Sequence, residues 1–213
     1  SSDLPGTTKD FVIPVLERFS GKKAGVDFGV CMAPEFLREG RAINDFLFPK
    51  DTGIVIGELD ARSGSLLLRI FKGFDGEVLR TSLGCAEMIK YARNAYLAKD
   101  VSFANEIANI CQKMGVDYLE VKKGMELDSR IGKGRFLDAG VGFGGSCFPK
   151  DVHALVKKSV QMDVKPRMLE AALKVNEEQP FIAVKLIKQV LGDVKGKRIA
   201  VLGTAFKPGT DDM

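Results

Sequence analysis

One long helix, predicted from Ser82 to Met114, constrains the fold of this 213-residue chain more than any other feature. Ser82 is a favourable N-cap residue, and Gly115 supplies a stop signal directly after the run. The residues between them are rich in alanine and apolar side chains, and the run is long for a globular helix. Helices of this length often pair with a symmetry mate, so we expect a homodimer that forms through this helix.

Around this helix the chain divides into three segments, which predict an α/β fold followed by an all-α part. Residues 1–80 alternate strands and helices, as parallel sheets do, residues 81–195 are helical, and residues 196–213 open with a strand that enters a glycine turn. The expected strands are Val26–Cys31, Ile54–Gly57, Val78–Arg80 and Lys197–Gly203. The other expected helices are Val12–Arg18, Ser63–Phe71, Val116–Lys123, Val152–Met162 and one or two helices within Met168–Leu191. Neither sheet is complete, so we expect the central part of a longer polypeptide.

Composition excludes several classes of protein. The net charge is only +4 and no basic run is present, so we expect no nucleic-acid partner. No apolar run approaches 18 residues, so we expect no membrane span. The four cysteines, Cys31, Cys85, Cys111 and Cys147, form neither a metal pattern nor a dense disulfide framework. We therefore expect no metal, and reduced thiols in the cytoplasm.

The most informative short motif is the glycine-rich run Gly140–Asp151, which reads GVGFGGSCFPKD. It delivers Cys147 to the predicted start of a helix, with Asp151 in the first turn. A thiol at a helix start beside a lysine is set up to act as a nucleophile. The only histidine, His153, lies roughly 240° further around that helix, so we expect it to point away from the thiol. This argues against a Cys–His hydrolase.

Four other motifs accompany this run, and each alone could be an ordinary surface feature. Two carboxylates four residues apart stand in Pro34–Gly40, and an amine and an amide share one helix face in Glu87–Asn94. The other two motifs are Leu127–Gly132, which contains Arg130, and Gly203–Lys207.

Together, in this order and over nearly the whole chain, the five motifs resemble the UDP-glucose/GDP-mannose dehydrogenase family. The resemblance implies the end of an NAD-binding Rossmann-like domain at 1–80, a central helical dimerisation domain at 81–195 and the first strand of a nucleotide-sugar-binding Rossmann-like domain at 196–213. It also implies that NAD is the cofactor and a nucleotide sugar the substrate. The C6 hydroxyl of that sugar would be oxidised to a carboxylate in two NAD-dependent steps.

The resemblance also assigns chemical roles. Cys147 would attack an aldehyde to give a thiohemiacetal, whose oxidation gives a thioester that water hydrolyses. Lys90 and Asn94 would stabilise the oxyanion at C6. Asp151 would handle water and protons, and Glu35 would act as acid or base in thioester hydrolysis. Implied contacts to the cofactor are Glu39 and Lys150, and implied contacts to the substrate are Phe36, Leu37, Arg130 (reaching across the dimer), Phe136, Leu137, Phe143, Gly144, Phe206 and Lys207.

The sequence departs from the family pattern at two places. The family has a serine–threonine pair before a proline-containing loop, and that threonine assists catalysis. Here we expect Ser2 to take the place of the threonine, as a catalytic and cofactor-binding residue, with Asp3 as the alternative in another register. The usual Asn-Pro-Glu reads Ala33-Pro34-Glu35, which removes one hydrogen-bonding side chain.

The substrate is not fixed by these motifs. Residues 20–30 and 55–60, and the length of 125–147, look most like the GDP-mannose branch of the family, so we expect GDP-mannose. The sequence of residues 127–132 looks more like the UDP-glucose branch, which makes UDP-glucose an alternative substrate. A UDP-N-acetylhexosamine is a further alternative. A non-enzymatic hypothesis is that this chain is an inactive dimerisation fragment, because most of the NAD site lies outside this sequence.

Overall fold

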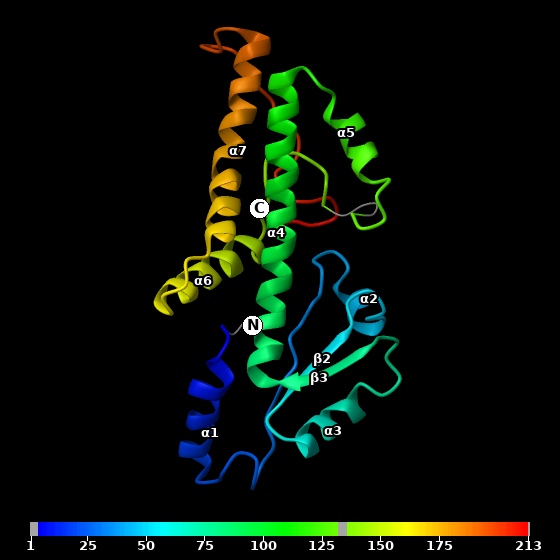
Figure 1. Cartoon of the computed structure of the whole chain (residues 1–213), viewed down its shortest axis with the longest axis vertical. Coiled ribbons are helices and arrows are strands. Elements are labelled where there is room, and N and C mark those ends of the chain that lie inside the picture. The colour runs from blue at the N-terminus through cyan, green and yellow to red at the C-terminus, as the bar shows by residue number, and fades with distance from the viewer. Residues whose placement is uncertain (1–3, 132–135, 213) are drawn as a thin grey trace. The chain divides into compact units, whose positions relative to one another are not determined.

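The structure, a computed structural model, describes residues 4–131 and 136–212 and combines helices with a small three-stranded sheet (Figure 1). It forms two compact units, Ser1–Arg93 and Asn94–Met213. The boundary between them falls inside the long helix α4, Leu83–Met114, so the first turns of α4 belong to the first unit and the remainder to the second. The expected mixture of helix and sheet is confirmed.

The first unit carries the sheet. Its elements are η1 (Thr8–Val12), α1 (Ile13–Ser20), β1 (Cys31–Met32), α2 (Ala42–Leu47), β2 (Ile54–Glu58), α3 (Ala61–Ile70) and β3 (Val78–Ser82). Strand β2 lies in the middle and pairs in parallel with β3, from Ile54 opposite Val78 to Glu58 opposite Ser82. Strand β1 pairs with β2 in antiparallel orientation. The expected parallel sheet is therefore correct for one of the two strand pairs.

Strand β2 forms the core of this unit, and a glycine allows α4 to approach it. Ile54, Val55 and Ile56 are buried. A Cβ on Gly57 would lie 2.5 Å from the Cβ of Ala86, closer than two carbon atoms can approach. The start of α4 therefore packs directly on the backbone of β2, and Arg93, further along α4, donates to the carbonyl of Thr52, which precedes β2.

The expected strand Val26–Cys31 is wrong. The N–H of Gly25 donates to the carbonyl of Phe28 at 2.8 Å, and Gly25 has φ +80°, so these residues form a tight turn. Val26 is largely exposed, and only Cys31 and Met32 pair with β2. The turn takes up the residues that the expected strand needs, so only its last residue, Cys31, is in a strand.

The second unit is helical. After α4 come α5 (Tyr118–Met125), α6 (Phe148–Gln161) and α7 (Arg167–Leu191), which is one continuous helix with Pro180 inside it. The second half of α4 and α7 run side by side (Figure 1), and the Ser102 hydroxyl donates to the Ala172 carbonyl at 2.7 Å. The predicted extent of α4 is confirmed, as is its cap, because the Ser82 hydroxyl accepts from the N–H of Cys85 at 3.3 Å.

The expected strand Lys197–Gly203 is also wrong, because residues 197–203 form neither helix nor strand. A strand satisfies its backbone groups by pairing with a neighbour, and no described residue pairs with this segment. Among the described residues, no helix combines the length and apolar character that a membrane crossing requires.

Candidate active site

The second unit places Cys147 at the start of α6. The residue is the N-cap of this helix, and its thiol is free and exposed. Asp151 lies in the first turn and is 1% exposed. Its carboxylate accepts from Asn94 Nδ2 at 2.6 Å and from Lys150 Nζ at 2.5 Å. Three predicted site residues, Asn94, Lys150 and Asp151, thus form one hydrogen-bonded cluster one turn beyond the cysteine.

The C-terminal segment lies against the glycine run. Ser146 N–H donates to Asp212 Oδ2 at 3.1 Å. Gly145 has φ +75°, and a Cβ at this position would lie 3.0 Å from the ring of Phe206. Lys207 Nζ lies 5.3 Å from the centre of the same ring. The structure therefore brings the predicted substrate residues Phe206 and Lys207 next to the run that carries Cys147.

Aromatic side chains gather at the start of α6. The ring of Phe148 lies 6.1 Å from that of Phe143 and 6.3 Å from that of Phe136. Phe136 is partly exposed, whereas the side chain of Leu137 is buried and its carbonyl accepts from the Tyr118 hydroxyl at 2.8 Å. Phe136 and Phe143 can therefore present ring surface to a ligand, while Leu137 offers backbone only.

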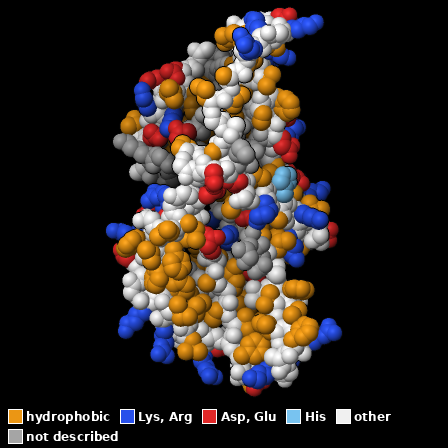
Figure 2. All heavy atoms as spheres, turned by 180° about the vertical axis from the view of Figure 1, so that it is seen from behind, with side chains coloured by type: hydrophobic (Ala, Val, Ile, Leu, Met, Phe, Trp, Pro, Cys, Tyr) orange, Lys and Arg blue, Asp and Glu red, His pale blue; other side chains and the backbone are white. Residues whose placement is uncertain are grey.

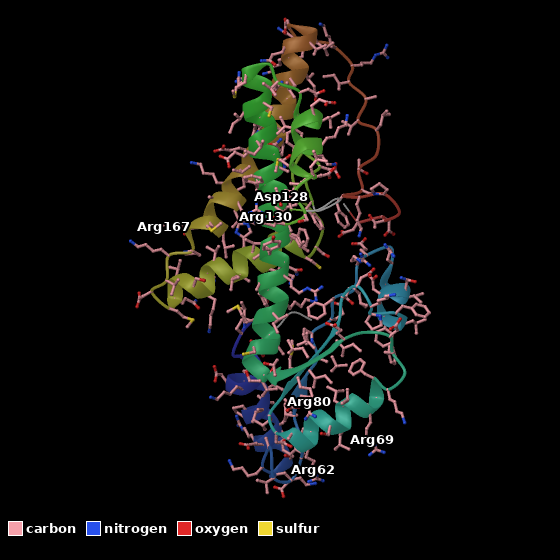
Figure 3. The ribbon with its side chains drawn as sticks, turned by 45° about the vertical axis from the view of Figure 1, so that its right-hand side comes forward. Arg62, Arg69, Arg80, Asp128, Arg130 and Arg167 are labelled. Atoms are coloured by element: carbon pink, nitrogen blue, oxygen red, sulfur yellow. The ribbon has the colours of Figure 1, made fainter. Side chains whose placement is uncertain are left out.

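Arg130 and His153 are both exposed. The side chain of Arg130 is 88% exposed and forms a 2.6 Å ion pair with Asp128 of its own loop (Figure 3). This guanidinium lowers the pKa of Asp128. His153 is exposed on α6. Among the described residues, no group of three histidine, cysteine or acidic side chains could hold a metal ion.

The first unit holds the predicted pair Lys90 and Glu35. Lys90 is only 8% exposed, and its Nζ donates to the Glu35 carbonyl at 2.7 Å and to Glu35 Oε2 at 3.2 Å. Next to it, the Arg93 guanidinium stacks on the ring of Phe36, 3.9 Å from the ring centre, and donates to the Thr52 carbonyl at 2.8 Å. Burial lowers the pKa of Arg93. Arg93 therefore holds a predicted substrate residue in place, although it was not among the residues predicted from the sequence.

A recess in the first unit is lined by the loop of residues 33–37 and by α2. Its walls include Glu35, Phe36, Leu37, Phe46 and Phe74. Hydrophobic side chains gather on the surface of this unit (Figure 2), and Phe46 and Leu37 are among the exposed ones. Glu39 lies in the turn that follows the loop and is partly buried. The predicted residues Glu35, Phe36 and Leu37 therefore share one partly apolar recess.

Asp45 fixes the loop that carries these residues. Its buried carboxylate accepts from the backbone N–H of Arg38 at 2.9 Å and forms a two-point ion pair with the Arg38 guanidinium. These contacts lower the pKa of Asp45 to about 2, from 3.8. A carboxyl whose pKa falls on folding stabilises the fold above its unfolded pKa, and this contribution disappears as the pH falls through its folded pKa.

We therefore predict that Asp45→Asn lowers the free energy of unfolding at neutral pH by about 1 to 2 kcal/mol, because it removes the ion pair with Arg38. The loss stays this small because Arg38 is partly exposed and solvent screens the pair. The difference from the wild type should shrink between the two pKa values, 3.8 and about 2. Urea unfolding across this pH range measures it. Asp51→Asn is the matched control, since Asp51 reaches Arg38 at 3.8 Å from an exposed position. Equal losses in both variants would contradict the prediction.

Glu87 is a second residue that the sequence analysis did not assign. It is 1% exposed, and its carboxylate accepts from the N–H of Gly6 at 2.6 Å and from the N–H and hydroxyl of Thr8 at 2.8 and 2.6 Å. It ties the segment that follows Ser2 to α4. Ser2 itself lies outside the described residues.

The residues present fit one part of an NAD site. The Lys150 side chain, three residues after Cys147, is largely exposed and can donate to an acceptor on a ligand. Glu39 presents a carboxylate in the first unit. The glycine fingerprint that holds a pyrophosphate is a strand followed by GxGxxG. The glycine spacing occurs at Gly140–Gly145, but residues 137–139 directly before it form no strand. The chain therefore offers candidate contacts to the cofactor without the pyrophosphate loop.

Family models match most of the chain. Residues 1–75 match the NAD binding domain of the UDP-glucose/GDP-mannose dehydrogenase family, and residues 85–178 match its central domain. The chain is 47% identical to UDP-glucose 6-dehydrogenase AglM of Haloferax volcanii, covering all of this chain and 50% of the relative. It is 45% identical to GDP-mannose 6-dehydrogenase of Pseudomonas putida, covering all of this chain and 48% of the relative.

A solved structure agrees with these matches. A UDP-glucose dehydrogenase from the archaeon Pyrobaculum islandicum superposes with a TM-score of 0.92 at 43% identity, covering all of this chain and 48% of that one. The chain spans about half the length of the relatives that it matches. With two consecutive domain models matched in the family's order, the chain belongs to the UDP-glucose/GDP-mannose dehydrogenase family.

Proposed function

We propose that the complete protein oxidises the C6 hydroxyl of a nucleotide sugar to a carboxylate in two NAD-dependent steps, with Cys147 as the covalent carrier. The observation that carries this proposal is the exposed thiol at the N-cap of α6, one turn from the Asn94–Lys150–Asp151 cluster. A four-electron oxidation passes through an aldehyde, and a thiol can hold that aldehyde between the two steps.

Addition of the Cys147 thiolate would link the two oxidations. The alcohol loses a proton and a hydride and becomes an aldehyde. The Cys147 thiolate adds to the aldehyde carbon, and protonation of the oxygen gives a thiohemiacetal. Loss of a second hydride and of that proton gives a thioester, and water then displaces the thiolate to give the carboxylate. NAD, when bound, accepts each hydride.

The polar residues of the chain would serve the charge and proton changes. Lys90 and Asn94, one turn apart on α4, would donate to the oxygen at C6 when it becomes negative. Asp151, held by Asn94 and Lys150, would accept a proton during oxidation and hydrolysis. Glu35, whose side chain is partly exposed beside Lys90, would direct the hydrolytic water.

The remaining predicted contacts are proposals of the same kind. Glu39, Lys150 and Ser2 would contact the cofactor, and Ser2 would also assist catalysis. Residues 1–80, 81–195 and 196–213 would belong to the cofactor-binding, central and nucleotide-sugar-binding domains. The substrate would meet the first unit at Phe36 and Leu37, and the second unit at Arg130, Phe136, Leu137, Phe143, Gly144, Phe206 and Lys207.

We propose GDP-mannose as the substrate, on the resemblance of residues 20–30 and 55–60 to that branch of the family. UDP-glucose is the second candidate, and the identity to the Haloferax volcanii relative supports it. NADH formation by the complete protein with each nucleotide sugar, and with a UDP-N-acetylhexosamine, distinguishes them. We expect two NADH per GDP-mannose consumed, and the 213-residue chain alone should form none. One NADH per sugar, or none with any of the three, would refute the proposal.

We also propose that the protein forms a homodimer through α4. Several apolar side chains of α4 are exposed in the single chain, including Tyr96, Phe103, Ile110 and Met114. Burial of such side chains between two copies would be favourable. Sedimentation of the protein used for the NADH assay measures this, and a monomer would contradict it.

A further inference from the structure

Three amide side chains hold the glycine run ahead of Cys147. Asn105 lies on α4, and Asn176 and Gln179 lie on α7, so all three belong to the second unit. None of them is a predicted site residue, and none belongs to the hydrogen-bonded cluster around Asp151. Each bonds to the backbone of the segment between Gly140 and Phe143.

Gly140 is held on both sides of its peptide backbone. Its N–H donates to Asn105 Oδ1 at 2.7 Å, and its carbonyl accepts from Gln179 Nε2 at 2.8 Å. Gln179 Oε1 in turn accepts from Asn109 Nδ2 at 3.0 Å, which fixes the orientation of the glutamine amide. Asn105 is 0% exposed and Gln179 6% exposed, so water does not compete for these bonds.

Phe143 is held by a single amide. Its N–H donates to Asn176 Oδ1 at 2.6 Å, and its carbonyl accepts from Asn176 Nδ2 at 3.0 Å. One side chain thus supplies both the acceptor and the donor that a neighbouring strand would supply. Gly142 makes room for it, because a Cβ at this position, where φ is +106°, would lie 2.5 Å from Asn176 Oδ1.

We propose that Asn105, Asn176 and Gln179 form an amide clamp that positions Cys147 for reaction. The inference rests on the proposed function, since it concerns the thiol that would carry the substrate. Only Gly144, Gly145 and Ser146 separate the clamped Phe143 from Cys147. Two of these are glycines, whose backbone can adopt many conformations. The clamp therefore fixes the position of Phe143, from which residues 144–146 lead to Cys147.

The clamp has a chemical consequence. Amides do not titrate, so the clamp keeps its hydrogen bonds at every pH at which the site works. A carboxylate or a lysine in the same positions would bring a charge close to the cysteine and bond to only one kind of backbone group. The clamp residues act through the loop, without contact to the reacting atoms.

Asn176→Ala and Gln179→Ala in the complete protein test this inference. Each variant removes bonds from one end of the clamped segment, so amide hydrogen exchange at 140–143 should accelerate by about tenfold or more. The rate of acid formation, kcat, should fall by about 10- to 100-fold because the thiol is misplaced, with little change in KM. Gln112→Ala is the matched control, an exposed amide on α4, and should alter neither quantity.

Asn176→Asp covers the case in which the alanine variants do not fold. The aspartate keeps an acceptor for the Phe143 N–H but loses the donor to its carbonyl, so kcat should still fall. Wild-type kcat in Asn176→Asp, or unchanged exchange at 140–143 in both alanine variants, would overturn the clamp. Exchange needs neither substrate nor NAD, so its outcome is independent of the proposed function, whereas a wild-type protein that forms no acid would refute that function alone.

Discussion

Cys147→Ala in the complete protein should reduce acid formation by about 10³-fold or more, a typical scale for removal of a nucleophile. The variant has no atom that can hold the aldehyde as a thiohemiacetal, so the second oxidation has no covalent intermediate. Cys147 is exposed at a helix start and contributes little to the core, so the variant should fold and still bind the nucleotide sugar. Acid formation is followed by product chromatography, and binding by calorimetry with the nucleotide sugar.

Cys85→Ala is the matched control for this experiment. Cys85 is also exposed, and the hydroxyls of Ser82 and Thr81 lower the pKa of its thiol. It is therefore the other reactive thiol with which a chemical effect on cysteine could be confused. Its replacement should leave acid formation unchanged. Normal acid formation by Cys147→Ala, or an equal loss in Cys85→Ala, would exclude the thioester mechanism.

Elements with strong local signals were predictable from the sequence. The helix Leu83–Met114 has a serine cap, a glycine stop and helix-forming residues between them, so local propensity and tertiary structure agree. The buried apolar run of β2 was equally clear, and the expected strand Val78–Arg80 is the first part of β3, although only Val78 and Leu79 there are apolar. The strand predictions at Val26–Cys31 and Lys197–Gly203 were wrong for different reasons. The first segment forms a turn closed by Gly25. The second has apolar residues but no partner strand among the described residues, and apolar residues alone do not reveal whether a partner is present.

Some residues of the candidate site could likewise be predicted from the sequence, and others could not. Cys147 and Asp151 stand in one short motif, and Asn94 can be placed by helical spacing. The amides that bind the glycine run are different, because an asparagine on a helix usually faces water and its partner here is a backbone group far along the chain. One signal was available: Asn105 follows Asn94 by 11 residues, which places both on one face of α4. Arg93 and Glu87 gave no comparable signal.

Lys90→Ala should lower kcat and kcat/KM together by about 10²- to 10³-fold, the range for removal of one donor to a developing oxyanion. In the structure the Lys90 ammonium is buried and already occupied by the carbonyl and carboxylate of Glu35. It is thus held in place before any substrate arrives, and a donor fixed in advance needs no reorganisation when charge develops at C6.

Two further variants separate this electrostatic role from a structural one. Lys90→Met keeps much of the apolar stem and should be as inactive as Lys90→Ala, because both lack the charge. Lys113→Ala removes a lysine from the last turn of the same helix and should retain full activity, since that lysine is remote in sequence from the predicted motifs. Steady-state kinetics with the preferred nucleotide sugar measures all three. A rise in KM with unchanged kcat would assign Lys90 to substrate binding, because a group that contacts substrate and transition state equally does not alter the chemical step.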